Sequence, residues 1–356
     1  MRFRPARRLA VLGTAAAALV AALAGCTGGS ASTALSGTAL SGTGSSGTGS
    51  SGTGSSGTVL SGTGQSSIAL SGLTHVDVGV LPIIDDAPVY VALQHGLFDA
   101  HGLDVTPVSL NSGEQATQEL LSGQLQFTFS NYVTTILTAS AGAQLRVVAD
   151  GAQTLPNTND LMVARDSPIN SVAQLRGKTI AVNAIGNVAT MMTDATLRAY
   201  GVPADSVHYK VLPFPEMAAA LAAHTVDAAY VSEPFITEAG EQTGAKELAD
   251  TASGSMASFP IAGYATLRSY ARANPAVVAE FTAALEQAEA MSANRSVVEQ
   301  TIPTYIDGMK PAMVAAVQLD QYPTALSEAR LQRVADTMLS AGLLSKPFDV
   351  TQLLSS

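Results

Sequence analysis

Residues 75–131 alternate between strand-like and helix-like patterns, and this alternation constrains the fold more than any other feature. The predicted order is a strand at 76–80, a helix at 87–95 that ends at a left-handed Gly96, a strand from 102, a helix at about 114–121 and a strand at 127–129. Strands separated by helices form parallel sheets, and ligands bind in the loops after the carboxyl ends of such strands. We therefore expect binding residues in loops 82–88, 111–114 and 130–134.

A second, similar unit follows. Its predicted strands are at 179–182, 209–212 and 228–231, with helices between them, and the remainder after about 265 is mostly helical. The chain crosses into this unit near 160 and returns near 255–265. We predict an α/β fold with two lobes, each a mostly parallel sheet flanked by helices: residues 73–160 with 263–356 form lobe I, and 161–262 form lobe II. Lobes joined by two or three chain crossings can close on a ligand.

The first 25 residues have the pattern of a signal peptide. Four arginines precede an apolar run of 16 residues, Leu9–Ala24, which is too short to span a membrane. The run ends in Leu-Ala-Gly-Cys, which resembles the bacterial lipobox, so Cys26 is the expected lipidation site and mature N-terminus. The alternative is that Cys26 is an incidental small residue near the cleavage site. Because it is the single cysteine of the chain, disulfides and thiolate metal sites are not expected.

Residues 27–72 carry no charge and consist largely of Ser, Gly and Thr, which predicts a flexible tether, so that 26–72 is a lipidated linker. Loss of the four signal arginines leaves 14 basic against 28 acidic residues, a net charge of −14. An acidic domain is a poor partner for nucleic acid or anionic lipid, so we expect the membrane to be reached through the lipid alone.

Several segments in order resemble one known family. They are 87–98, 102–105, 112–114, 120–124, 175–182, 220–221, 226–228 and Glu233-Pro234-Phe235. Together they resemble the ABC-transporter solute-binding proteins of the nitrate/sulfonate/taurine and thiamine-pyrimidine-precursor group, over about residues 73–300. The resemblance implies a type II periplasmic-binding-protein fold that holds its ligand between the lobes, with a separate permease and ATPase as partners.

Asp85 and Asp86 are the best sequence clue to the charge of the ligand. They are either a solvated loop or, if one faces the cleft, a feature that favours a cationic or donor-rich ligand over an anion. No Lys or Arg occurs in the candidate loops at 82–88, 111–114, 130–134, 154–160 and 184–190, which argues against nitrate and sulfonates.

Other candidate ligand-binding residues lie on the same loops. Ser112 and Gln115 have capping-box spacing, so Ser112 either only caps a helix or also contacts the ligand. The same choice applies to Gly186 and Asn187. Tyr132, Phe235 and Phe259 are candidate aromatic walls, although each is also a typical core residue. The remaining candidates are Gly113, Asn131, Asn159 and Glu233.

No enzyme pattern stands out: the sequence has no phosphate-binding loop and no nucleophile elbow, and its five histidines are scattered. We expect a monomeric, extracytoplasmic lipoprotein without cofactor or metal that delivers a small organic solute to an ABC importer. A ligand-sensing surface protein without transport is the alternative, and an enzyme would have to turn over its bound substrate.

Overall fold

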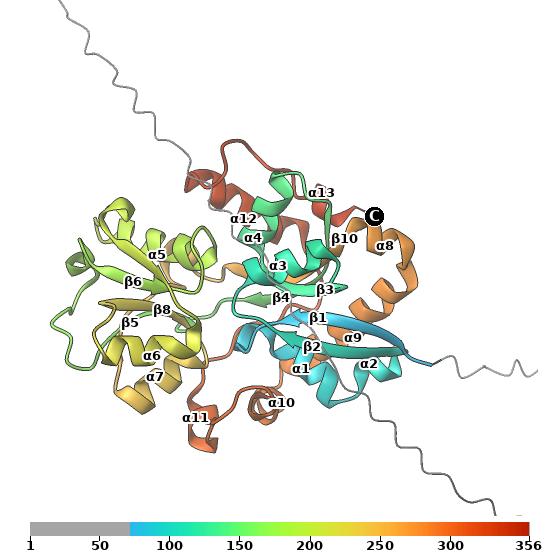
Figure 1. The fold of residues 1–356 in the computed structure, drawn as a ribbon, viewed down its shortest axis with the longest axis horizontal. Coiled ribbons are helices and arrows are strands. Elements are labelled where there is room, and N and C mark those ends of the chain that lie inside the picture. Colours follow the sequence, from blue (N-terminus) through green and yellow to red (C-terminus); the bar gives the residue numbers. More distant parts are fainter. Residues whose placement is uncertain (1–71, 356) are drawn as a thin grey trace, which may run out of the picture. The chain divides into compact units, whose positions relative to one another are not determined.

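The computed structural model describes residues 72–355, which contain two five-stranded sheets flanked by helices (Figure 1). The predicted signal peptide, the Cys26 lipidation site and nearly all of the linker lie outside the described residues. The predicted fold class is confirmed, because each lobe has one sheet in which four strands run in the same direction.

The first sheet has the order β2-β1-β3-β10-β4. Its strands are β1 (Thr74–Val80), β2 (Leu103–Ser109), β3 (Phe127–Asn131), β4 (Leu145–Gln153) and β10 (Pro260–Leu267). β1 pairs in parallel with β2 and β3, whereas β10 pairs antiparallel with β3 and β4. β10 runs in the opposite direction because the chain enters it on its return from the other lobe.

The second sheet repeats this plan in the order β7-β6-β8-β5-β9. Its strands are β5 (Asn159–Val163), β6 (Thr179–Val182), β7 (His208–Val211), β8 (Ala228–Ser232) and β9 (Lys246–Asp250). Here β5 is the reversed strand, antiparallel to β8 and β9. In both sheets, the amino end of the reversed strand therefore lies at the same edge as the carboxyl ends of the other strands.

Helices cover the sheets of both lobes. The first lobe carries η1 (Ile84–Asp86), α1 (Ala87–Gln94), α2 (Leu97–Ala100), α3 (Gly113–Ser122) and α4 (Tyr132–Ser140), and the second carries α5 (Val188–Ala199), α6 (Phe214–Ala222) and α7 (Phe235–Thr243). Gly96 follows α1 with a φ of 65°, the left-handed conformation predicted from the sequence. Short 3-10 turns η2 (Val172–Leu175), η3 (Ala204–Ser206) and η4 (Gly254–Met256) lie in the loops.

The C-terminal part is helical, as predicted. Its elements are α8 (Arg268–Ala273), α9 (Pro275–Ser292), α10 (Arg295–Thr301), η5 (Ile302–Thr304), α11 (Pro311–Ala316), α12 (Glu328–Ser340) and α13 (Thr351–Leu354). α9 packs on α1 and α2, α12 packs on α4, and α11 reaches α7 of the other lobe (Figure 1). Residue Gln321 also bridges to Gln153 at the end of β4, so a third segment runs beside the two chain crossings.

The sequence did not predict β9, β10 or α7 as separate elements. β10 was expected only as the returning chain, because Pro260, Gly263 and its alanines weaken the usual strand signal. The 82–86 loop also differs: it contains η1, and both Asp85 and Asp86 are buried. The solvated-loop alternative for these two acids is therefore wrong.

Candidate functional site

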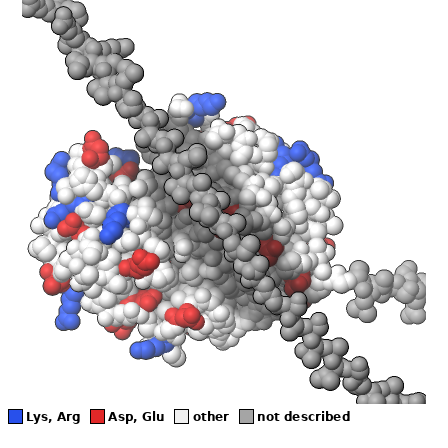
Figure 2. Space-filling view, in the orientation of Figure 1, with Lys and Arg blue, Asp and Glu red and all other residues white. Residues whose placement is uncertain are grey.

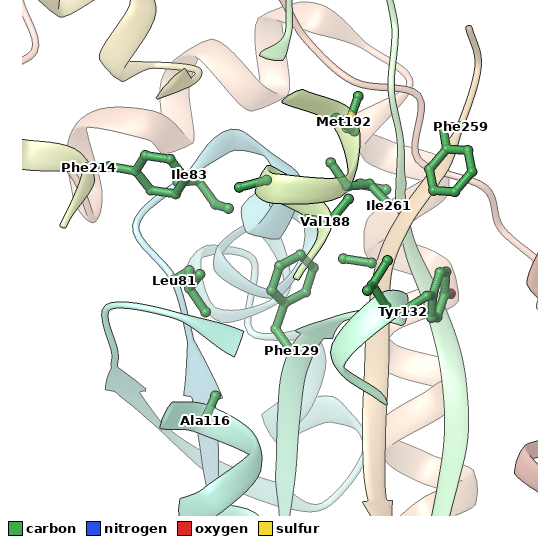
Figure 3. Packing of buried hydrophobic residues seen from close by; sticks show 14 of the residues in the cluster. Leu81, Ile83, Ala116, Phe129, Tyr132, Val188, Met192, Phe214, Phe259 and Ile261 are labelled. Atoms are coloured by element: carbon green, nitrogen blue, oxygen red, sulfur yellow. The ribbon is translucent and has the colours of Figure 1, made fainter. Parts of the chain in front are cut away.

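A cavity lies between the two lobes at the edge where the strands of both sheets end. Fourteen residues line it: Leu81, Ile83, Asp85, Gly113, Phe129, Asn131, Asn159, Asn183, Val188, Phe214, Tyr230, Ser232, Ile261 and Ala262. Figure 3 shows the apolar part of this lining, with Leu81, Ile83 and Phe129 of the first lobe opposite Val188 and Phe214 of the second. The cavity encloses about 30 Å³, room for a water molecule or two. An organic ligand therefore enters only when the lobes move apart.

Asp85 connects the lobes inside this cavity. Its Oδ1 accepts a hydrogen bond from the hydroxyl of Ser232 at 3.1 Å, and the adjacent Ile84 amide donates to the carbonyl oxygen of Glu233 at 3.1 Å. Ile84 and Ala87 pack into a small separate core formed by α10, α11 and Tyr322, which holds η1 in place. Burial raises the pKa of Asp85 to about 6, and the hydrogen bond from Ser232 opposes this rise.

Asp320 lies behind Asp85, on the loop between α11 and α12. It is 5% exposed, and no hydrogen-bond donor of the described residues contacts either carboxyl oxygen. Burial and the nearby negative charge of Asp85 raise the pKa of Asp320 well above its usual range. Two neighbouring buried acids oppose each other's ionisation, and the pKa of Asp320 is raised further than that of Asp85. The pair therefore carries one proton and one negative charge near neutral pH.

Asp86 has a different role from its neighbour. One of its oxygens accepts from the Leu81 amide at 2.9 Å and the other from the hydroxyl of Tyr264. It is fully buried and does not line the cavity. Burial raises its pKa well above the usual range. Asp86 therefore fixes the turn after β1, and this turn positions Asp85.

Asn131, the last residue of β3, presents a free amide donor to the cavity. Its Oδ1 caps α4 by accepting from the Thr134 amide at 2.9 Å, which directs Nδ2 away from the helix. No hydrogen bond within residues 72–355 engages that Nδ2, although Asn131 is only 7% exposed. A Cβ on Gly113 would lie 2.9 Å from Nδ2, so glycine leaves the room that this amide occupies.

The second lobe presents Asn183 in a similar way. Asn187 caps α5 by accepting from the amides of Ala189 and Thr190, and its own Nδ2 donates to the Oδ1 of Asn183 at 3.1 Å. This bond leaves the Nδ2 of Asn183 available to a ligand. Asn159 is already used, because it accepts from Tyr230 at 2.7 Å and donates to Thr158 at 3.2 Å.

Of the eleven ligand-binding residues proposed from the sequence, four line the cavity: Asp85, Gly113, Asn131 and Asn159. The other seven lie outside its lining: Asp86, Ser112, Tyr132, Gly186, Asn187, Glu233 and Phe235. Ser112 caps α3 by accepting from the Gln115 amide, and Tyr132 is a core residue whose hydroxyl donates to Asp150.

Gly186, Glu233 and Phe235, three more of these seven residues, belong to the layer that surrounds the cavity lining. Gly186 takes the left-handed backbone conformation before α5, with φ of 78°. Glu233 caps α7 through Thr237 and also accepts from the Gln318 amide at 3.0 Å. Phe235 stacks on the cavity residue Phe214, with ring centroids 6.0 Å apart. Phe259 is fully buried in the core beneath the Arg333 guanidinium.

Two cavity residues, Asn183 and Ser232, were not predicted from the sequence. The rule that ligands bind at the carboxyl ends of parallel strands could have identified both. Asn183 directly follows β6, and Ser232 ends β8, so both stand at carboxyl ends of parallel strands. The apolar residues that line the cavity are not marked by their position in the sequence. Phe214 and Ile261 look like ordinary core residues in sequence, and only the approach of the lobes brings them to the cavity.

None of the residues lining the cavity is Lys, Arg or His. Within residues 72–355, no cluster of three or more His, Cys, Asp or Glu side chains is arranged to hold a metal ion. No helix in the same residues is both long and apolar enough to cross a bilayer.

Comparison with known proteins agrees with this architecture. A family model described as NMT1/THI5 like matches residues 84–295, more than half of the chain. A protein of Escherichia coli strain K12, named as an aliphatic sulfonates-binding protein, is 28% identical over 254 residues, covering 69% of this chain and 77% of its own length.

Two solved structures show the same fold. The alkanesulfonate-binding protein SsuA from Xanthomonas axonopodis pv. citri, bound to MOPS, has a TM-score of 0.68 and 22% identity, covering 80% of this chain and 99% of its own. The periplasmic nitrate-binding protein NrtA from Synechocystis has a TM-score of 0.62 and 14% identity, covering 77% and 83%. The family resemblance predicted from the sequence is confirmed.

Proposed function

The chain belongs to the NMT1/THI5-like family, and on this premise we propose that it is an extracytoplasmic solute-binding lipoprotein. It captures a small organic molecule between its lobes and delivers it to an ABC importer, that is, to a permease with its ATPase. The named sequence relatives and the two solved structures above are solute-binding proteins, although a desulfurization enzyme at 17% identity shares the fold. The observation that carries the proposal is the cavity lined by both lobes, at the edge where ligands of α/β sheets bind.

The hinge supplies the mechanism. The segments 154–158 and 251–259 connect the two sheets, and rotation about them opens the cavity to solvent. A ligand that contacts both lobes binds the closed form more strongly than the open form, so it shifts the population towards closure. A permease that recognises the closed arrangement then distinguishes loaded from empty protein.

A thermal-shift panel tests this function. Nitrate, alkanesulfonates, pyrimidines, flavins and amines are each added to the protein, and the Tm is recorded. We expect one chemical class to raise Tm in proportion to the logarithm of its concentration above Kd, because only the folded protein binds. Asn183→Ala should reduce that shift, whereas substitution of the exposed Lys210 should not. If every class leaves Tm unchanged, the binding function is contradicted.

The lipid anchor is part of the proposal and rests on the Leu-Ala-Gly-Cys sequence alone. Cys26→Ala should abolish lipid labelling and leave the protein unprocessed or released to the medium. Continued labelling of that variant would exclude Cys26 as the attachment site.

A further inference from the structure

The charge of the cavity wall comes from one acidic residue. Asp85 is the only charged residue among those lining the cavity. The titratable groups that interact with it from the surrounding elements are likewise acids and phenols: Asp86, Asp320, Tyr230, Tyr305 and Tyr322. A carboxylate in a poorly solvated wall without a countercharge attracts a cation more strongly than the same group does in water.

The ionisation of Asp85 depends on its neighbour Asp320. Because the pKa of Asp320 is raised further than that of Asp85, Asp320 keeps the proton of the pair and Asp85 ionises first. Ser232 donates to one of the roughly four lone-pair sites of the Asp85 carboxylate. Asp85 lines a cavity whose wall contains no other charged side chain.

A second observation points to a ligand at the same place. Asn131 lines the cavity and is more than nine-tenths buried, and its Nδ2 donates to no residue of the described chain. A donor without a protein partner at the wall of a cavity is a position where a ligand can place an acceptor atom. The apolar rings of Phe129 and Phe214 line the same cavity.

Resting on the proposed function, we infer that the solute is an organic cation. Its positively charged nitrogen binds Asp85, an acceptor atom binds the Nδ2 of Asn131, and its apolar body packs between Phe129 and Phe214. Asp320 is a positioning residue: because it keeps the proton of the pair, Asp85 stays ionised at the cavity wall.

Matched probes test the charge directly. Propyl, benzyl and pyridylmethyl compounds are each compared as the ammonium ion, the alcohol and the sulfonate, on the full-length protein, by thermal shift and then by calorimetric titration. We expect the ammonium members to bind, and each alcohol and sulfonate to bind at least tenfold more weakly than its ammonium counterpart. A quaternary benzyltrimethylammonium ion is included because its charge does not depend on pH.

Three variants locate the charge. Asp85→Asn keeps the shape and removes the carboxylate, so it should weaken ammonium binding by about 10- to 100-fold at pH 7.5. The matched control Asp99→Asn lies on the surface of α2 and should change nothing. Asp320→Ala removes the protonated neighbour that lowers the pKa of Asp85, so it should move the loss of binding to higher pH.

The pH profile provides a readout that a merely structural role would not move. Because Asp85 loses its proton at about pH 6, affinity for the quaternary ion should be constant above pH 7 and fall up to tenfold per unit below pH 6. Ser232→Ala removes the hydrogen bond that stabilises the carboxylate, so it should shift this fall to higher pH.

The outcomes separate the two claims. If sulfonates or alcohols bind better than their ammonium counterparts, or if Asp85→Asn binds the ammonium ions as well as Asp99→Asn does, the cation inference is overturned while the binding function stands. If no member of this panel or of the broader one binds, the proposed function itself fails.

Discussion

At the scale of single residues, close packing of Tyr132 against the backbone of β10 determines where the first lobe's part of the cavity wall lies. Tyr132 was proposed from the sequence as an aromatic wall, yet it lies beneath β10, where its hydroxyl donates to Asp150. A Cβ on Gly263 would lie 2.3 Å from that hydroxyl and 2.7 Å from the carbonyl oxygen of Ala149. Glycine at this position therefore lets β10 lie directly on Tyr132, and β10 carries the cavity residues Ile261 and Ala262.

Gly263→Ala should consequently destabilise the protein. The Tyr132 hydroxyl is fixed by its hydrogen bond, and the Ala149 carbonyl oxygen is fixed by the backbone. Making room for the extra methyl should therefore lower the free energy of unfolding by about 1–3 kcal/mol. Gly240→Ala is the matched control: its Cβ would meet no atom closer than 3.9 Å, and helix α7 should gain roughly 0.5–1 kcal/mol. Chemical denaturation measures both. Equal stability of the two variants would contradict this packing.

At the scale of elements, helix α9 carries a buried acid without a partner. Glu289 is 1% exposed, and neither of its carboxyl oxygens has a hydrogen-bond donor within residues 72–355. Burial, with a smaller effect from the negative charge of Asp150, raises the pKa of Glu289 from its usual 4.5 to about 9. The folded protein thus holds a proton here that the unfolded chain releases above pH 4.5. The contribution of Glu289 to stability is full below pH 4.5 and is lost as pH rises towards 9.

Glu289→Gln should remove this pH dependence. The amide cannot ionise, so the variant should gain stability over the wild type as pH rises from 5 to 9, by a few kcal/mol at the upper end. Glu216→Gln, at an exposed position of α6, makes the same charge change without burial. Denaturant midpoints of the wild type and both variants, measured between pH 5 and 9, test this prediction. Parallel profiles for the wild type and Glu289→Gln would show that Glu289 is ionised in the folded state.

Patterns within a few residues predict single helices, caps and strands, but they do not predict contacts between distant parts of the chain. Helix α1 with its left-handed Gly96, the Ser112 cap and the strand at 179–182 follow from patterns within a few residues, and the structure contains them. The burial of Asp85 does not, because it depends on Ser232 and Asp320, more than 140 positions away in the chain. Seven of the eleven proposed site residues do not line the cavity, since a helix cap and a cavity residue look alike in sequence.

At the scale of the whole described unit, the two lobes are connected by a third segment, residues 317–322, in addition to the two chain crossings. The Gln318 amide donates to Glu233 of the second lobe, and Gln321 pairs with Gln153 of the first. The sequence predicted the crossings but not this third connection, which forms by long-range pairing alone. On the face shown in Figure 2, basic and acidic side chains are intermixed on the left-hand lobe and much of the remaining described surface is uncharged, so this face offers no basic patch to nucleic acid.

Closure of the two lobes around a solute can be followed by a distance across the cavity. With Cys26 replaced by Ser, the chain has no other cysteine, so Asn111→Cys and Glu216→Cys place one spin label on an exposed position of each lobe. We expect a broad distance distribution for the unliganded protein, because the closed cavity of about 30 Å³ admits no organic molecule without opening. The ligand that raises Tm most should shorten and narrow that distribution. An unchanged distribution at saturating ligand would contradict binding by lobe closure.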